Sequence, residues 1–242
     1  MAELKVPSLQ HLARNWRDDP VRIKKVLVRL ATNPPIFNYN PLFSAARDLL
    51  VLRIPYDQVA QGIRRGVKRD AVRNNLLSVL PLIRDHFADV APDFIQSIDR
   101  RYYPVGRGLM VPFEPPMIYG VGGQLYFPWF SFWRQNPLAK ERLSLFVTLV
   151  EEVLLQDPDL ESARFDILDF SAPRGTRELT VIDARDIPRI DEARKLAMLS
   201  TFAEGFFQAQ AELKSKPERG AEKESDEKRD PDQPGFFDEQ AT

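Results

Sequence analysis

The chain changes character close to residue 100, and this change limits the folds that are open to it. Before that point, apolar residues recur at the three- and four-residue spacing of amphipathic helices, from Leu12 to Phe87. After it, residues 100–137 are rich in Gly, Pro and aromatic residues, in short alternating runs that favour β-strands. A purely helical fold and a purely β fold are therefore both excluded.

The expected elements follow from these patterns and from the residues that interrupt them. Pro55 breaks one helix, Asp57 can cap the next, and Gly66 separates that helix from a third. The predicted helices are 8–32 (interrupted near residues 18–20), 42–53, 56–65, 69–87, a short one from Pro92, 138–156 and 191–213. The predicted strands are 108–113, 117–121, 124–132, 163–170 and 178–185.

This order predicts an α+β fold with three parts. A basic helical region at 1–101 precedes an α/β core at 102–213, which holds a mostly antiparallel sheet of about five strands. The remainder, 214–242, has 15 charged residues in 29 positions, and its only bulky apolar residues are Phe236 and Phe237. Such a composition predicts a disordered tail, because too little apolar surface is present to offset the entropy of ordering.

The composition excludes several classes of protein. The absence of cysteine excludes disulfide frameworks and Cys-ligated metal sites, and it suits a reducing cytoplasm. With only His11 and His86 as histidines, any metal site has to come from carboxylates, which favour magnesium. The chain has no apolar run long enough to span a membrane and no signal-peptide core, so we expect a cytoplasmic protein without a membrane contact.

Positive charge is concentrated in the helical region. Residues 1–101 carry 17 Lys/Arg and 10 Asp/Glu, whereas residues 102–213 carry 11 and 16. Within the first part, "PYDQVAQGIRRGVKRDAVRNNLL" resembles a helix-turn-helix. The resemblance implies that DNA is contacted at the turn and at the start of the second helix, by Arg64, Arg65, Lys68, Arg69 and Arg73. The alternative is a solvated basic face of a helical bundle.

A second stretch, "RFDILDFSAPRGTRELTVIDAR" at 164–185, resembles the catalytic hairpin of PD-(D/E)xK nucleases. In that family one strand supplies an Asp, and the next carries an acid and a Lys two residues apart. The resemblance implies that Asp169, or alternatively Asp166, holds magnesium together with Asp183. Alternation along a strand places Asp183 and Arg185 on one face, with Arg185 at the Lys position.

The nuclease resemblance extends over 151–195 and involves three further residues. Glu151 or Glu152, on the preceding helix, would supply another acid. Because an Arg stays protonated and replaces a water-orienting Lys poorly, Lys195 on the following helix is a second cation to consider. The alternative is a scaffold hairpin whose acids face solvent.

The tail contains one more pattern, "QPGFF" at 233–237. It resembles the short peptide by which bacterial proteins dock on the DNA sliding clamp: a Gln, two variable residues, an apolar residue and a Phe. The resemblance implies that the rings of Phe236 and Phe237 enter adjoining pockets of the clamp while Gln233 bonds at the rim. The alternative is that the two rings pack on the protein's own surface.

Together these features predict a bacterial-type, DNA-associated protein of the maintenance, repair or mobile-element and defence kind. Its helical part would bind DNA, its tail would bind a clamp, and its hairpin would be that of a degenerate or divergent magnesium-dependent nuclease. Whether the chain is an enzyme stays open at this level. The alternative function is a non-enzymatic regulatory or interaction module with no nucleic-acid role.

Overall fold

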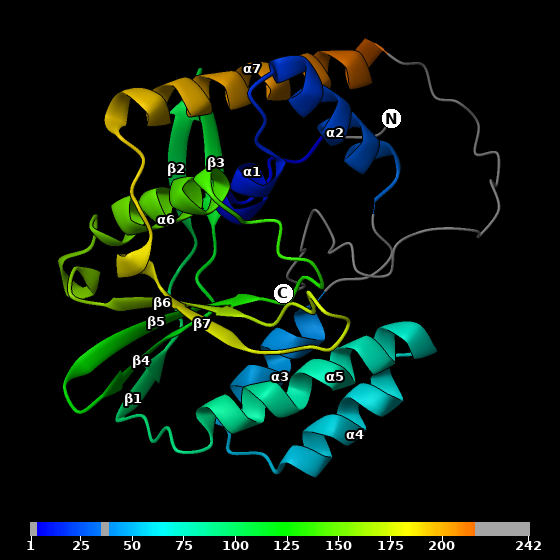
Figure 1. Ribbon diagram of the computed structural model, residues 1–242, viewed down its shortest axis with the longest axis vertical. Coiled ribbons are helices and arrows are strands. Elements are labelled where there is room, and N and C mark those ends of the chain that lie inside the picture. The colour runs from blue at the N-terminus through cyan, green and yellow to red at the C-terminus, as the bar shows by residue number, and fades with distance from the viewer. Residues whose placement is uncertain (1–3, 35–38, 216–242) are drawn as a thin grey trace.

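The computed structural model describes residues 4–34 and 39–215 (Figure 1), and over them the fold is α+β, as predicted. The helices are α1 (Leu9–Asn15), α2 (Pro20–Thr32), α3 (Asn40–Leu50), α4 (Tyr56–Gly66), α5 (Asp70–Phe87), α6 (Glu141–Leu154) and α7 (Glu192–Ser215). Two 3-10 helices are η1 (Pro158–Leu160) and η2 (Ala184–Asp186). None of the helices in these residues is both long enough and apolar enough to cross a membrane.

The strands form a five-stranded sheet and a separate hairpin. They are β1 (Phe94–Gln96), β2 (Arg101–Gly106), β3 (Leu109–Phe113), β4 (Ile118–Val121), β5 (Gln124–Ser131), β6 (Arg164–Asp169) and β7 (Thr180–Asp183). The sheet has the order β1-β4-β5-β6-β7. Three of its pairings are antiparallel and β5–β6 is parallel, so the prediction of a mostly antiparallel sheet is confirmed.

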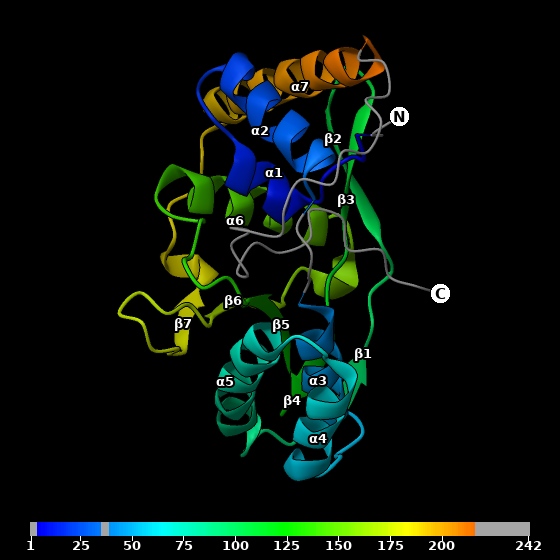
Figure 2. The ribbon, with the colours of Figure 1, turned by 90° about the vertical axis from the view of Figure 1, so that its right-hand side faces the viewer.

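Strand β5 is buried on both faces, which explains its nearly unbroken aromatic sequence. On the side covered by α6, Phe127 contacts Phe165 and Trp129 contacts Phe146, and the rings of Phe146 and Phe165 also contact each other. Trp129 stacks on Phe113, which Phe127 meets edge to face. Phe130, on the other face, contacts rings of α3 and α5. The helices therefore sandwich the sheet, with α6 on one side and α3 and α5 on the other (Figures 1 and 2).

The two ends of the described chain pack against each other on the far side of α6. Helix α2 lies along α7, the β2–β3 hairpin contacts both α6 and α7, and α1 packs on α6 (Figure 1). The indole Nε1 of Trp16 donates to the carbonyl of Met198 at 3.1 Å. Contacts thus cross the expected boundary at residue 101, because the apolar stripe of α2 is buried against a helix from the opposite end of the chain.

The sequence prediction misplaced three segments near this boundary. The helix expected from Pro92 is wrong: Phe94–Gln96 forms the edge strand β1, antiparallel to β4. The strand Arg101–Gly106 was not predicted, and its partner β3 lies outside the main sheet. Pairing with β4 makes Phe94–Gln96 a strand. The ring of Phe94 lies directly over Gly120 of β4, and a Cβ on Gly120 would be only 2.3 Å from Cε1 of that ring.

The surroundings of two helical glycines predict opposite effects of a Gly→Ala substitution on the free energy of unfolding. A Cβ at Gly205 would lie 2.7 Å from Cβ of Ile23 and 2.8 Å from the carbonyl oxygen of Pro20, whereas a Cβ at Gly62 meets nothing within 4 Å. We expect Gly205→Ala to lower the free energy of unfolding by about 1–3 kcal/mol through overpacking. Gly62→Ala, the matched control, should raise it by about 0.5–1 kcal/mol through helix propensity. Urea unfolding measures both values, and a neutral Gly205→Ala would contradict the close α2–α7 contact.

Candidate functional site

The β6–β7 hairpin places the predicted metal ligands on different faces of the sheet. Asp166 pairs directly with Asp183, while Asp169 pairs with Thr180. Directly paired residues share a face, and residues three apart on one strand do not. Asp169 is therefore on the face opposite to Asp183, and about 10 Å along the strands from it. The acid beside Asp183 is the alternative one, Asp166.

The carboxylate of Asp183 is bound by two arginine side chains and by the backbone N–H of Arg185. Nη2 of Arg185 lies 2.6 Å from Oδ2 of Asp183, and Nε of Arg185 is 3.0 Å from Oδ1. Arg164 adds a contact at 3.5 Å, and the backbone N–H of Arg185 donates to Oδ1 at 2.9 Å, which caps η2. These bonds, chiefly those from the Arg185 side chain, lower the pKa of Asp183 to about 2. The Asp-x-Arg sequence thus forms a helix cap and an ion pair.

Asp166 and Arg164 complete this cluster. Nε of Arg164 donates to Oδ1 of Asp166 at 3.0 Å. Burial raises the pKa of Asp166, although the bond from Arg164 opposes that effect. Two carboxylates and two guanidiniums therefore balance one another across β6, β7 and η2.

Asp169 has a structural environment of its own. Only 8% of the residue is exposed. Its Oδ1 accepts from the backbone N–H of Ser171 at 3.1 Å, and its Oδ2 accepts from Nδ2 of Asn136 at 3.0 Å and from Oγ of Ser171 at 3.1 Å. These bonds fix the loops that follow β5 and β6.

The predicted helix acids are also held by cations. Glu151 forms a bidentate ion pair with Arg189. Oε1 of Glu152 accepts from Nζ of Lys195 at 2.6 Å, and its Oε2 accepts from the hydroxyl of Tyr103 at 2.5 Å. Burial, followed by the bond to Glu152, raises the pKa of Tyr103. Lys195 therefore contacts Glu152 of α6, beside Tyr103 of β2, and does not reach the β6–β7 hairpin.

The predicted magnesium site is accordingly not assembled. Across residues 4–34 and 39–215, no three His, Cys, Asp or Glu side chains group in a way that could hold a metal ion. Asp169 and Asp183 point to opposite faces, and Glu151 and Glu152 are bound to Arg189 and Lys195. The residues present do not fit the metal, and no hydrolytic step follows from them.

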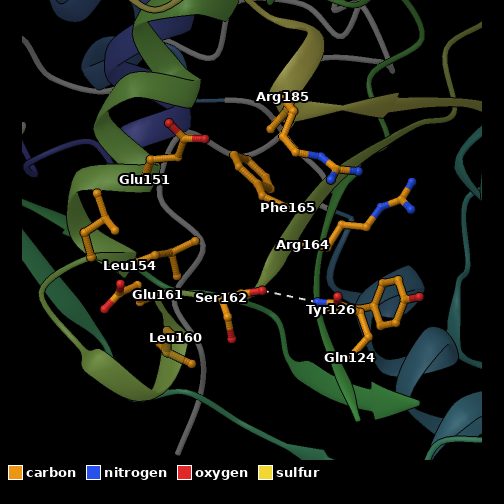
Figure 3. A pocket seen from close by; sticks show the side chains of 13 residues that line it. Gln124, Tyr126, Glu151, Leu154, Leu160, Glu161, Ser162, Arg164, Phe165 and Arg185 are labelled. Atoms are coloured by element: carbon orange, nitrogen blue, oxygen red, sulfur yellow. Dashed lines mark hydrogen bonds between the residues drawn. The ribbon is translucent and has the colours of Figure 1, made fainter. Parts of the chain in front are cut away.

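A cleft of about 480 Å³ lies beside the hairpin, between the end of α6, η1 and the starts of β5 and β6 (Figure 3). Its lining combines the apolar Leu154, Leu160 and Phe165 with Glu151, Arg164 and others. Gln124 closes one side by donating from its amide to the carbonyl of Ser162 at 3.2 Å. Arg164 and Glu151 are each paired with an opposite charge. Glu161 also lines the cleft, and it is exposed without an ion pair to the described residues.

The predicted basic cluster lies at one end of a helical hairpin. Helices α4 and α5 run side by side in opposite directions (Figure 1), joined by residues 67–69. Arg64 and Arg65 lie in the last turn of α4, and Lys68 and Arg69 lie in the connection. All four are exposed, and none forms an ion pair with the described residues. The hairpin tip therefore presents four uncompensated positive charges.

Arg73, the fifth predicted residue, has a different role. Its Nη2 contacts Oδ1 of Asp70 at 2.5 Å, and its Nη1 donates to the carbonyl of Val67 at 3.1 Å. Both bonds tie the connection to the first turn of α5. We therefore assign Arg73 to the structure of the tip and the other four cations to its surface.

Sequence reasoning missed a groove between α3 and α4. It encloses about 510 Å³ and is lined by Asp48, Gln58 and nine small or apolar residues: Pro41, Ser44, Ala45, Ile54, Val59, Gly62, Ile63, Gly66 and Val67. The signal that could have revealed it is the pair Gly62 and Gly66, one turn apart on the same face of a helix. Both have open space where a Cβ would be.

The remaining predicted residues, Gln233, Phe236 and Phe237, lie outside the described residues. Comparisons with family models, with curated proteins and with solved structures find no match to this chain.

The assignment of Glu152 as a structural partner predicts the effect of removing its cation. Only 7% of the Lys195 side chain is exposed, against 34% for Glu152. We expect Lys195→Met to lower the free energy of unfolding by about 2–3 kcal/mol, somewhat less than for a fully buried pair, because a carboxylate is left without its cation. Glu192→Ala removes the exposed second partner of Lys195 and should cost about 1 kcal/mol or less. Equal effects in chemical denaturation would contradict the assignment.

Proposed function

We propose that this protein is a non-catalytic, DNA-associated protein that contacts the phosphate backbone through the tip of the α4–α5 hairpin. The observation that carries the proposal is the exposure of Arg64, Arg65, Lys68 and Arg69 without acidic partners among the described residues. Most arginines around the hairpin cleft and along α7, by contrast, are bound to carboxylates, as Arg164, Arg185, Arg189 and Arg194 are.

The charge of the surrounding helices supports this assignment. Residues 39–88, which include α3, α4 and α5, contain eight Lys/Arg and four Asp/Glu. No side chain caps the N-terminus of the 18-residue helix α5, which begins directly after Lys68 and Arg69 and has one acid, Asp70, in its first turn. Free N–H groups and the positive end of a helix dipole favour a phosphate at this position.

The antiparallel arrangement of α4 and α5 also suggests how DNA would be bound. A helix-turn-helix inserts a second helix that crosses the first into the major groove. Here the helices lie alongside each other, so the hairpin presents its end to the duplex. Such a contact favours the phosphate backbone over base edges, and it predicts binding with little dependence on sequence.

The tail supplies the recruitment step of the proposal. By its resemblance to clamp-docking peptides, "QPGFF" would bring the chain to a sliding clamp in a bacterial-type cytoplasm, through Gln233, Phe236 and Phe237. A weak, sequence-tolerant DNA contact together with a clamp contact gives an avidity that neither contact has alone. This combination suits DNA maintenance, repair, or mobile-element and defence proteins.

The rival function is an interaction module with no role on nucleic acid, and the apolar α3–α4 groove favours it. The two functions make different predictions about salt. Binding through phosphates releases counterions and weakens steeply as salt rises, whereas docking of an apolar peptide changes little.

The first test replaces the four tip cations. We expect R64A/R65A/K68A/R69A to weaken duplex binding and to reduce the slope of log K against log salt by about 0.9 for each phosphate that the protein no longer neutralises. The matched control removes four exposed cations elsewhere, Lys25, Arg29, Arg174 and Lys214, with the same change in net charge. A salt titration by fluorescence anisotropy measures both slopes. Equal slopes for the two variants would leave the interaction module as the better assignment.

The second test concerns the tail alone. A synthetic peptide of residues 228–242 should bind a purified bacterial sliding clamp with a Kd on the order of micromolar, since so short a segment loses conformational entropy on binding. Replacing Phe236 and Phe237 by Ala should abolish binding, and Gln233→Ala should weaken it less, because buried rings dominate such contacts. Failure of both the peptide and the full chain to bind at high clamp concentration would remove clamp recruitment from the proposal.

A further inference from the structure

The α3–α4 groove has an open floor that the fold itself does not explain. Gly62 and Gly66 lie on the same side of α4, and an added Cβ at either position would meet nothing within 4 Å. A glycine inside a helix costs about 0.5–1 kcal/mol relative to Ala, so Gly62 lowers the stability of α4 without relieving any internal contact, while Gly66 is the last residue of the helix. Their small size does leave room for a group that approaches α4 from outside.

The walls of the groove favour an apolar occupant. Val59 and Ile63 are almost fully buried at its base, and the half-buried Ile54 and Val67 form its sides. Its volume of about 510 Å³ is in the range of small-ligand sites. Asp48 is the one charged residue that lines it.

The rim at the end of α4 favours an acidic occupant. Arg65 precedes the lining residues Gly66 and Val67, and Lys68 and Arg69 follow them directly. The three cations have no acidic partner within the described part of the chain. An apolar group flanked by carboxylates would therefore satisfy both the floor and the rim of the groove.

One segment of this chain has that chemistry. Residues 230–242 carry four acids and no Lys or Arg, and they contain two adjacent rings, Phe236 and Phe237. Asp232 precedes the rings, and Asp238 and Glu239 follow them. The region of α3, α4 and α5 and the tail have net charges of equal size and opposite sign: residues 39–88 sum to +4, and residues 216–242 sum to −4.

We infer that the groove between α3 and α4 is the docking site for the chain's own segment 232–239. The two Phe rings lie on the backbone of α4 over Gly62 and Gly66, and the flanking carboxylates face Arg65, Lys68 and Arg69. In this state the tail covers three of the four cations that the proposed function assigns to DNA. A clamp that captures the same two rings would draw the tail away and uncover these cations, so clamp binding and DNA binding are coupled through the groove.

The length of the tail permits this contact. Twenty residues separate Ser215 from Phe236, and an extended chain of that length spans about 70 Å. A compact fold of this size has a radius of gyration of about 17 Å, so the groove is within reach of the end of α7. A tethered segment also acts at an effective concentration on the order of millimolar, so a weak intrinsic affinity is sufficient for occupancy.

The absence of cysteine allows a direct test in the full chain. A nitroxide attached to Thr242→Cys, on otherwise unmodified ¹⁵N-labelled protein, would broaden amide signals near the docked tail. We expect the signals of Gly62, Gly66 and Val67 to lose most of their intensity relative to the reduced nitroxide. F236A/F237A should restore them, and so should Gly62→Leu, which fills the groove at an exposed helix position where nothing lies within 4 Å of a Cβ.

The matched control is Gln61→Leu, which adds a side chain of the same kind at an exposed neighbour outside the groove and should leave the broadening intact. Unchanged broadening in F236A/F237A or in Gly62→Leu would overturn the docking site. A sample that mixes nitroxide-bearing ¹⁴N chains with unmodified ¹⁵N chains tests the alternative occupant. Broadening of the nitroxide-free ¹⁵N chains in that mixture would assign the groove to the tail of a second copy and overturn docking within one chain.

The coupling to DNA rests on the proposed function, but the docking measurement contains neither DNA nor clamp. Its failure is therefore distinguishable from a failure of DNA binding. If both hold, F236A/F237A should bind duplex DNA more tightly than the unmodified chain at low salt, because Arg65, Lys68 and Arg69 are then uncovered. Equal affinity of these two proteins, with docking established, would overturn the coupling.

Discussion

The parallel pairing of β5 with β6 is the constraint on which the rest of the structure depends. Two parallel strands cannot be joined by a tight turn, so the chain has to leave the end of β5, cross one face of the sheet as α6, and return. The crossover gives α1 and the β2–β3 hairpin a helix to pack against, and α7 is joined to that helix by the ion pairs Arg194–Glu141 and Lys195–Glu152. The opposite face of the sheet is left to α3 and α5, which hold α4 and the basic tip away from the crossover.

Most of the fold could be predicted because its elements obey local rules. Asp19 caps α2 by accepting from the N–H of Val21, Pro55 precedes α4, and the aromatic residues of β5 alternate between two buried faces. The strands near residue 100 could not be predicted in the same way. Phe94–Gln96 is too short to have a period, and its structure comes from pairing with β4, a partner more than twenty residues away. Local propensity contains no information about such a partner.

The features of the candidate sites were likewise predictable where the local sequence determines them and unpredictable where long-range packing does. That Arg64, Arg65, Lys68 and Arg69 gather at one turn follows from the sequence, since a helix–loop–helix of this length has only one tip. That Asp183 pairs with Asp166 instead of Asp169 follows from the register of β6 and β7, which the loop between them does not specify. A shift of one position would exchange the two faces of β7. The α3–α4 groove depends on how two helices lie against each other, and only its two glycines are visible in the sequence.

The contact between α2 and α7 has a consequence for how the protein is made. Buried residues of α2, including Ile23 and Leu27, pack beside a helix that begins at Glu192. During synthesis the N-terminal helices emerge long before their partner, and they keep an apolar stripe exposed until more than 160 further residues have been translated. Contacts of such long sequence separation also slow folding, because loop closure has to precede them. The ribosome-bound chain therefore passes through a period in which α3, α4 and α5 can pair locally while the apolar stripe of α2 still lacks its partner.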